Sequence, residues 1–279
     1  MARTVARLVR PPSLEPGVCY DKLDLGQGAV LHVFSPSTGG SDAGLLWIHG
    51  GGMVVGAASQ DSSLCVDLVR ELRLSVASMD YRLAPEHPFP TPMDDCHAGW
   101  KRLVERSEQY GLNPARIAVG GQSAGGGIAA GLVQRLHDEG GVQPAAQWLF
   151  CPMLDDRTAA DRQQDRVSHF LWNNRANRYG WRAYLQTEPG APTVPPYASP
   201  SRRTGLAGLP PAWIGTGDID LFYAENRAYA DALTAAGVDC TLEVVHGAAH
   251  AFETVAANTR VARDYTAHAR AWLRDRMRL

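Results

Sequence analysis

One serine in this chain stands in a setting suited to nucleophilic catalysis. Ser123 is the centre of a Gly-Gln-Ser-Ala-Gly segment at residues 121–125, which follows an apolar run at 117–119 and leads into an Ala/Leu-rich helical stretch. This pattern predicts a sharp turn from a strand into a helix, where a strained backbone lifts the serine hydroxyl above the sheet edge. Gly121 and Gly125 leave room for that turn because they carry no side chain. Taken alone, the same pattern also suits a small residue that merely fills a glycine-rich turn.

A second glycine cluster upstream favours the catalytic interpretation. The apolar run at residues 45–48 leads directly into His49 and the three glycines 50–52. Backbone amides without neighbouring side chains can approach the negative oxygen that develops when a serine attacks a carbonyl group. His49 is expected to support this loop rather than to take part in the reaction.

The chain also offers a base and an acid downstream of the serine. A serine hydroxyl needs a neutral histidine to take its proton and an acid to orient that histidine. His250 lies in the loop between the last predicted strand (residues 242–245) and the last helix, whereas His246 follows the strand directly and is expected to close it. His250 is therefore the better candidate for the base. Asp218 and Asp220 both follow the preceding predicted strand, and the pattern alone does not separate them.

The composition excludes several other classes of protein. The 279 residues carry a formal net charge of −2, and their scattered charges form no basic stripe of the kind that nucleic-acid binding requires. No apolar stretch reaches the roughly 18 residues needed to span a membrane. Pro11 and Pro12 follow the N-terminal arginines where a secretory signal would need an apolar core, so a cytoplasmic protein is expected. His246 and His250 have no Glu or Asp to complete a metal site, and neither a metal nor a cofactor is expected.

Short apolar runs alternate with helical stretches from about residue 45 to the end, a pattern typical of a mostly parallel sheet with helices on both faces. The strands are predicted at residues 45–48, 76–79, 117–119, 148–150, 212–214 and 242–245, with an antiparallel hairpin of 18–25 and 30–34 at the sheet edge. Apolar residues at helical spacing are expected to face the core. These are Leu64, Leu68 and Leu72 behind Ser62 as N-cap, then Trp100, Leu103 and Val104, and in the last helix Val261, Tyr265, Ala269 and Trp272.

Residues 157–200 break this alternation and are rich in Arg, Asn, aromatic residues and Pro. We expect one α/β domain over residues 1–279, in which 157–200 form a cap or lid excursion and residues 1–16 a short N-terminal segment. The aromatic residues of the excursion could line a substrate pocket or anchor the lid to the domain. They are Trp172, Tyr179, Trp181 and Tyr184.

From about residue 16 to its end, the chain resembles the bacterial hormone-sensitive-lipase-like esterases of the α/β-hydrolase fold. The resemblance rests on the segments at residues 49–52, 80–90, 121–125, 152–157 and 220–222. The order Ser, acid, His along the chain is also that of α/β-hydrolases. Since the acid in this family directly precedes Leu-Phe, the resemblance implies that Asp220 rather than Asp218 is the acid, and it assigns the base to His250. It implies that the oxyanion is held by the amides of Gly51, Gly52 and Ala124.

The chain departs from the family pattern in several places. Gln122 stands where the family usually has Asp, and Ala251 stands where it usually has Gly, which we expect to shift the loop of His250 slightly. The segment before the first strand is short, so a shallow and open pocket is expected. The run at 80–90, with Arg82 and Glu86 as candidate ion partners, is expected to support the glycine loop rather than to bind substrate.

Together these features predict a serine carboxylic-ester hydrolase that cleaves short-to-medium-chain acyl esters through an acyl-enzyme intermediate. Its partner would be a small-molecule ester, and the resemblance leaves a homodimer open. An amide, carbamate or lactone hydrolase with the same three residues is the alternative. A hydrolase fold that only binds a small molecule is a further alternative, although none of the expected catalytic positions is lost.

Overall fold

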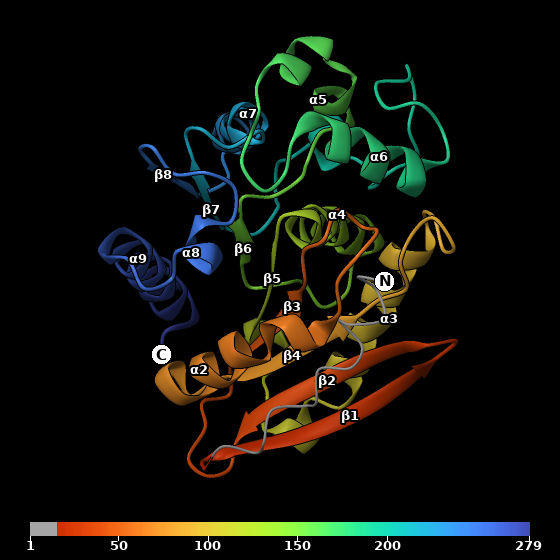
Figure 1. The fold of residues 1–279 in the computed structure, drawn as a ribbon. Helices are drawn as coiled ribbons and strands as arrows, with labels where there is room; N and C mark the ends of the chain where they lie inside the picture. The colour runs from red at the N-terminus through yellow and green to blue at the C-terminus, as the bar shows by residue number, and fades with distance from the viewer. Residues whose placement is uncertain (1–15) are drawn as a thin grey trace.

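A single eight-stranded sheet runs through the part of the chain that the computed structural model describes, residues 16–279 (Figure 1). Its strand order is β1-β2-β4-β3-β5-β6-β7-β8. The strands are β1 (Val18–Gly26), β2 (Ala29–Pro36), β3 (Gly44–Ile48), β4 (Ser75–Asp80), β5 (Ile117–Gln122), β6 (Gln147–Phe150), β7 (Ala212–Gly217) and β8 (Cys240–Val245). Every predicted strand is confirmed. The predicted N-terminal segment lies, except for Pro16, outside the described residues.

The sheet is mostly parallel, as the sequence predicts. β1 pairs with β2 and β2 with β4 in antiparallel fashion, so the predicted hairpin is confirmed and forms one edge of the sheet. The other neighbours, from β4 through β3 and β5 to β8, pair in parallel. The carboxyl ends of the parallel strands therefore meet at one edge, where α/β proteins place their ligands.

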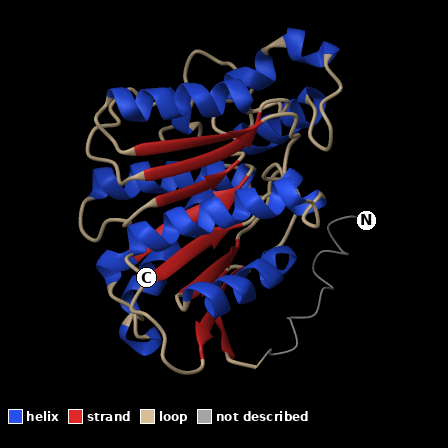
Figure 2. Cartoon of the chain, turned by 90° about the vertical axis from the view of Figure 1, so that its left-hand side faces the viewer, coloured by secondary structure: helices blue, strands red, loops and turns tan. Residues whose placement is uncertain are grey.

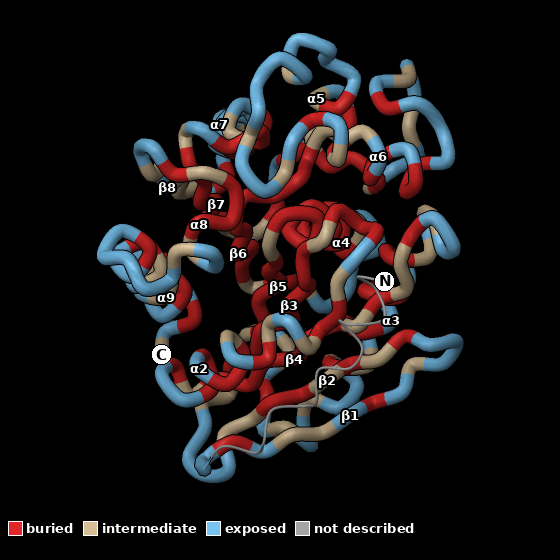
Figure 3. The backbone as a smooth tube through the Cα atoms, in the orientation of Figure 1, coloured by how far each residue is buried: buried red, intermediate tan, exposed pale blue. Residues whose placement is uncertain are grey.

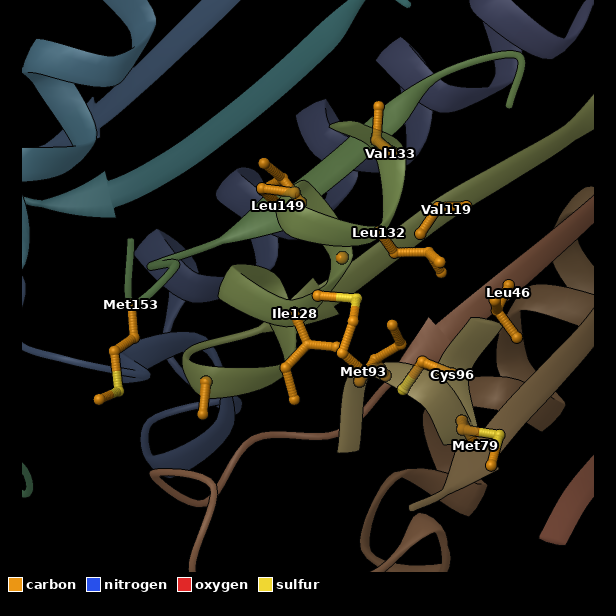
Figure 4. Close-up of a cluster of buried hydrophobic side chains, with 14 of the residues drawn as sticks. Leu46, Met79, Met93, Cys96, Val119, Ile128, Leu132, Val133, Leu149 and Met153 are labelled. Atoms are coloured by element: carbon orange, nitrogen blue, oxygen red, sulfur yellow. The ribbon is translucent and has the colours of Figure 1, made fainter. Parts of the chain in front are cut away.

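Helices cover both faces of the sheet (Figure 2). One face packs against α3 (Thr91–Glu105), α4 (Ala124–Glu139) and α7 (Tyr223–Ala235), and the other against α2 (Ser62–Leu72), α8 (Phe252–Val255) and α9 (Arg260–Met277). Helix α6 (Asn174–Leu185) adds buried side chains to the first of these two cores. Side chains alternate between the faces along a strand. In β3, Leu46 and Ile48 enter the first core, part of which Figure 4 shows, while Leu45 and Trp47 enter the second. β3 and β6 are buried throughout, and β5 is buried except at its last residue, Gln122 (Figure 3).

Two details of the predicted helices are wrong. Ser62 is the first residue of α2 rather than its N-cap, because a 3-10 turn at Ala58–Asp61 runs directly into the helix. Val261 is 53% exposed, whereas Tyr265 and Ala269 are buried as expected. Successive residues of a helix are rotated by about 100° around its axis. Ala262 belongs to the buried stripe of α9, so its neighbour Val261 falls at the edge of that stripe. 

Residues 156–202 form no strand and lie beyond the carboxyl ends of the strands (Figure 1). They contain α5 (Asp156–Ala160), two 3-10 turns that we label η4 (Arg162–Arg166) and η5 (Pro200–Arg202), and α6. We call residues 157–200 the cap. Within residues 16–279, no helix has both the length and the hydropathy to cross a membrane.

The carboxyl group of Asp61 lies against a buried aromatic cluster beneath α2 and α9. The Trp47 indole packs against Trp148 and Phe150 and donates a hydrogen bond of 2.8 Å from Nε1 to Oδ2 of Asp61. Burial raises the pKa of Asp61 to about 6, with a smaller contribution from the charge of Glu253. Ionised Asp61 therefore destabilises the fold.

Replacing Asp61 with asparagine is expected to stabilise the protein at neutral and alkaline pH. The folded state binds the Asp61 proton more tightly than the unfolded state, so stability falls as the pH rises from about 4 to 6. Asp61→Asn removes this loss of stability and keeps an oxygen that can accept from Trp47. The substitution should raise the free energy of unfolding by about 1–2 kcal/mol at about pH 8. Urea unfolding over a pH series measures the effect, which should shrink toward zero near pH 4. A gain that is independent of pH would contradict the explanation.

Candidate active site

Ser123 occupies the turn between β5 and α4. Its backbone has φ 55° and ψ −121°, a conformation that L residues rarely adopt and that matches the strain expected at this corner. Ser123 N donates to Phe150 O at 2.8 Å, which ties the turn to the end of β6. The following helix passes so close to β3 that a Cβ on Gly125 would lie 2.1 Å from Ile48 O. Only glycine fits there.

His250 links Ser123 to Asp220. Its Nε2 lies 2.9 Å from Ser123 Oγ, and its Nδ1 lies 2.8 Å from Asp220 Oδ2. Asp220 Oδ1 also accepts a hydrogen bond from Phe222 N at 2.9 Å, which fixes the carboxylate. All three side chains are buried, and the Phe222 ring packs edge-on against the imidazole. The structure thus brings together the serine, base and acid selected from the sequence.

Asp218 and His246 form a separate pair at the surface. His246 Nδ1 lies 2.6 Å from Asp218 Oδ2, and Gly247 N donates to Asp218 Oδ1 at 2.7 Å. The His246 ring is almost fully exposed. β8 ends at Val245, so His246 follows the strand end directly, as expected. Asp218 therefore stabilises the turn that leads toward His250, and it does not bind the His250 imidazole.

The glycine loop lies beside the serine turn. A Cβ built on Gly50 would approach Ser123 Cβ to 3.4 Å, so the loop backbone touches the turn. No acceptor among residues 16–279 pairs with the amides of Gly51, Gly52 or Ala124. The site therefore offers three N–H donors, at the positions that the family resemblance selects for an oxyanion.

The segment after β4 supports the glycine loop, as predicted. The Tyr81 ring stacks on the His49 ring with centroids 4.3 Å apart, and Tyr81 Oη donates to His49 O at 2.9 Å. Ala84 N donates to Met53 O at 3.0 Å. Burial lowers the pKa of His49, and its Nδ1 lies 2.7 Å from Gly50 O, so a neutral imidazole braces the loop.

The expected ion pair in this segment is wrong. Arg82 forms a bidentate pair with Asp95 of α3, the shortest distance being 2.7 Å, instead of the expected pair with Glu86. Asp95 Oδ2 also accepts from Arg82 N at 2.9 Å. This contact fixes the segment to α3, which the spacing of charges along the chain could not reveal.

The two departures from the family pattern meet near His250. Gln122 Nε2 donates to Glu253 Oε1 at 2.7 Å and to Thr254 Oγ1 at 2.9 Å, which ties the residue before Ser123 to α8. Ala251 has φ 53° and ψ 31°, the left-handed conformation that glycine adopts easily. Alanine adopts it at a cost of roughly 1–2 kcal/mol.

The aromatic residues of the cap divide between two roles. Trp172 lies against the glycine loop, since a Cβ on Gly52 would clash with its ring at 2.1 Å. Trp181 and Tyr184 are buried in the core and anchor α6, whereas Tyr179 is exposed. Only Trp172 of these four is placed to face the site. 

The charge of Asp220 acts on the cap residue His169. Burial lowers its pKa, and the charge of Asp220 acts in the opposite direction. The segment around His169 therefore lies within electrostatic reach of Asp220, although sequence reasoning did not single it out.

A thiol also lies next to the three residues. In the described part of the chain, Cys151, Asp220 and His250 form the one group of three potential metal ligands, with ligand atoms within 4.8 Å of one another. Ser123 and Asp220 already engage both nitrogens of His250, so the arrangement fits a hydrogen-bond relay better than a metal site. Sequence reasoning did not single out Cys151 or Glu253, because each reaches the site through the fold and not through a motif.

Comparisons with known proteins find similar sequences and a similar fold over most of the chain. Residues 45–254 match the model of a family described as the alpha/beta hydrolase fold. The carboxylic ester hydrolase LipN of Mycobacterium tuberculosis is 36% identical over 225 residues, which cover 78% of this chain and 59% of LipN. The ethyl acetate hydrolase of Pseudomonas putida is 33% identical over 211 residues, which cover 75% of this chain and 66% of that protein. The chain thus spans less than two thirds of either relative.

A solved structure extends the likeness over the whole chain. A bacterial heroin esterase superposes with a TM-score of 0.91 and 37% sequence identity, covering 100% of this chain and 91% of the other. Fold, motifs and comparisons therefore lead to one conclusion: the chain belongs to the hormone-sensitive-lipase-like esterases of the α/β-hydrolase fold.

Proposed function

We propose that this protein is a serine carboxylic-ester hydrolase that acts on short-to-medium-chain acyl esters. The observation that carries the proposal is the buried relay in which His250 lies 2.9 Å from Ser123 Oγ and 2.8 Å from Asp220 Oδ2. These are distances at which protons transfer between heavy atoms. The esterase names of the relatives support the same reaction type.

In the proposed mechanism, His250 Nε2 takes the Ser123 proton as Oγ attacks the ester carbonyl carbon. Asp220 holds the imidazole by its Nδ1–H and stabilises the imidazolium that forms. His250 then donates the proton to the leaving alcohol as the C–O bond breaks, which leaves an acyl group on Ser123. Water, deprotonated by the same imidazole, cleaves this acyl-enzyme and restores the serine.

The negative charge that develops on the carbonyl oxygen needs donors that are already in place. We propose that the amides of Gly51, Gly52 and Ala124 supply them. The lack of other acceptors for these amides within residues 16–279 supports this role. Because Tyr81 and His49 brace the loop, little reorganisation is needed when the charge appears.

We further propose that the chain is one α/β-hydrolase domain over residues 1–279 and that the cap, residues 157–200, bounds the substrate site. The contact of Trp172 with the glycine loop supports this arrangement. The name of the ethyl acetate hydrolase supports small acyl groups. The reaction as proposed uses no cofactor or metal.

A serine-directed aryl phosphonate would test the assignment. The reagent should form one adduct per chain, and peptide mapping should locate it at Ser123 and at no other serine. Parallel assays of an aryl ester and the matching anilide would separate ester hydrolysis from the amide alternative, and we expect the ester to be faster. An adduct elsewhere, or no adduct at all, would contradict the proposal.

A further inference from the structure

A strongly basic pocket lies in the cap, away from Ser123. It has a volume of ≈ 510 Å³ and lies between η4 and the N-terminus of α6. Four of its lining residues are arginines and one is an acid: Arg162, Arg166, Arg175, Arg178 and Asp165. In a chain of net charge −2, this is a local concentration of positive charge.

The single acid does not neutralise the four arginines. Asp165 pairs with Arg162 at 2.8 Å and with Arg178 at 3.2 Å. No carboxylate in the described part of the chain pairs with Arg166 or Arg175, and both are exposed. Two guanidinium groups of the pocket are therefore left to bind an anion, and guanidinium forks match the geometry of phosphate and carboxylate oxygens.

The N-terminus of α6 adds backbone donors to the same pocket. The first turn of a helix has N–H groups without intrahelical acceptors. Asn173 Oδ1 accepts from Ala176 N at 3.1 Å, but the amides of Asn174 and Arg175 have no acceptor among residues 16–279. α6 has 12 residues, so its dipole also favours an anion at this end.

A buried polar atom provides an independent sign of a ligand. Asn174 is only 1% exposed and lines the pocket. Its Nδ2 donates to Asp161 O at 2.9 Å and to Asp165 Oδ1 at 3.0 Å, whereas no donor in residues 16–279 reaches its Oδ1. A buried acceptor without a donor costs free energy, which a hydroxyl group of a ligand would recover.

We propose that this pocket binds a phosphoryl group, either free or as part of a larger ester. A phosphoryl group carries up to two negative charges for Arg166 and Arg175 and several oxygens that can accept from the first-turn amides of α6. In its monoprotonated form it also has a P–OH donor for Asn174 Oδ1. An ionised carboxylate has no hydroxyl donor, so it could bind the arginines and the backbone amides but not Asn174 Oδ1.

The pocket has a direct connection to the active site. Its two walls, η4 and the start of α6, are the two ends of the segment 167–173. That segment carries Trp172, which packs on the glycine loop, and His169, which lies within reach of the charge of Asp220. A bound phosphoryl group would join the two ends and hold the segment over the catalytic residues.

Calorimetric titration with inorganic phosphate at constant ionic strength tests the proposal. The titration uses the full chain, and repeating it on Ser123→Ala makes the readout independent of hydrolysis. The test variant is Arg166→Gln/Arg175→Gln, and the matched control is Arg182→Gln/Arg227→Gln, which removes two arginines that do not line the pocket. Unchanged melting temperatures without phosphate would establish that both double variants fold.

We expect saturable phosphate binding to the parent, Ser123→Ala and control proteins, and binding at least tenfold weaker in Arg166→Gln/Arg175→Gln. Acetate should bind at least tenfold more weakly than phosphate. Phosphatidylcholine vesicles with and without phosphatidic acid form a second arm. If only the acidic vesicles bind, and the test variant loses this binding, the phosphoryl source is a lipid headgroup. Equal binding by all variants, or no binding of either probe, would overturn the proposal.

Discussion

Ser123→Ala is expected to lower kcat for a short-chain aryl ester by about 10³–10⁶-fold while leaving the fold intact. The Oγ atom is the proposed nucleophile, and within residues 16–279 no other hydroxyl pairs with His250 Nε2. The residual rate would come from substrate binding and the three free amides, which remain. The loss should appear in kcat rather than in KM, because the missing group acts on the reacting carbon and not on substrate binding.

The structural cost of this substitution is small. Alanine keeps a Cβ at the strained backbone position, and the only side-chain hydrogen bond lost among residues 16–279 is that to His250 Nε2. The melting temperature should therefore stay within a few degrees of the parent. Ser63→Ala, at an exposed position of α2, is the matched control and should retain full activity. Turnover by Ser123→Ala within tenfold of the parent would rule out the proposed nucleophile.

The strands were predictable because each is a short apolar run bounded by turn residues. The helices between them were predictable because their apolar residues recur every three to four positions. The strand-turn-helix corner of Ser123 follows from the same local rules. Ile48 O lies so close to this corner that only glycine fits on either side of the serine. In the sequence this requirement is visible as the Gly-x-Ser-x-Gly pattern. Local chemistry thus determines the position of the nucleophile.

Contacts between distant segments were not predictable in this way. Asp95 binds Arg82 across 13 residues, and Gln122 binds Glu253 across 131. Neither pair has a fixed spacing along the chain, because packing of α3 and α8 against the sheet brings the partners together. 

The cap was the least predictable part of the chain. Residues 157–200 have no strand period and only one long helix, so nothing in the sequence placed Trp172 on the glycine loop or gathered the arginines of η4 and α6 into one pocket. These arrangements depend on how α6 packs onto the core through Trp181 and Tyr184.

The two candidate acids differ by two positions, and the turn after β7 decides between them. Asp220 N donates to Gly217 O at 3.3 Å, so the chain reverses and carries the Asp220 carboxylate into the buried side. Asp218 stays near the surface and binds the Gly247 amide, which, with His246, lowers its pKa. Periodicity does not describe such a turn, which is why only the family resemblance favoured Asp220.

Because the two aspartates bind different histidines, substituting each of them with asparagine should affect catalysis very differently. Asp220→Asn should lower kcat by about 10⁴-fold, because an amide can donate to Nδ1, hold the imidazole in the wrong tautomer and leave the imidazolium without a counter-charge. Asp218→Asn should keep kcat within about threefold, since its amide oxygen can still accept from Gly247 N. Both variants remove one negative charge, so they control for net electrostatics.

The comparison is decisive because the two positions share a turn and differ in their histidine. If Asp220 orients His250, the Asp220→Asn loss lies in kcat, and melting temperatures of the two variants stay similar. If Asp218→Asn instead caused the larger loss of kcat, the acid would act through the turn at Gly247, and the relay through Asp220 Oδ2 would not be the catalytic one. Steady-state kinetics of the two purified variants on one aryl ester therefore identify which carboxylate serves the base.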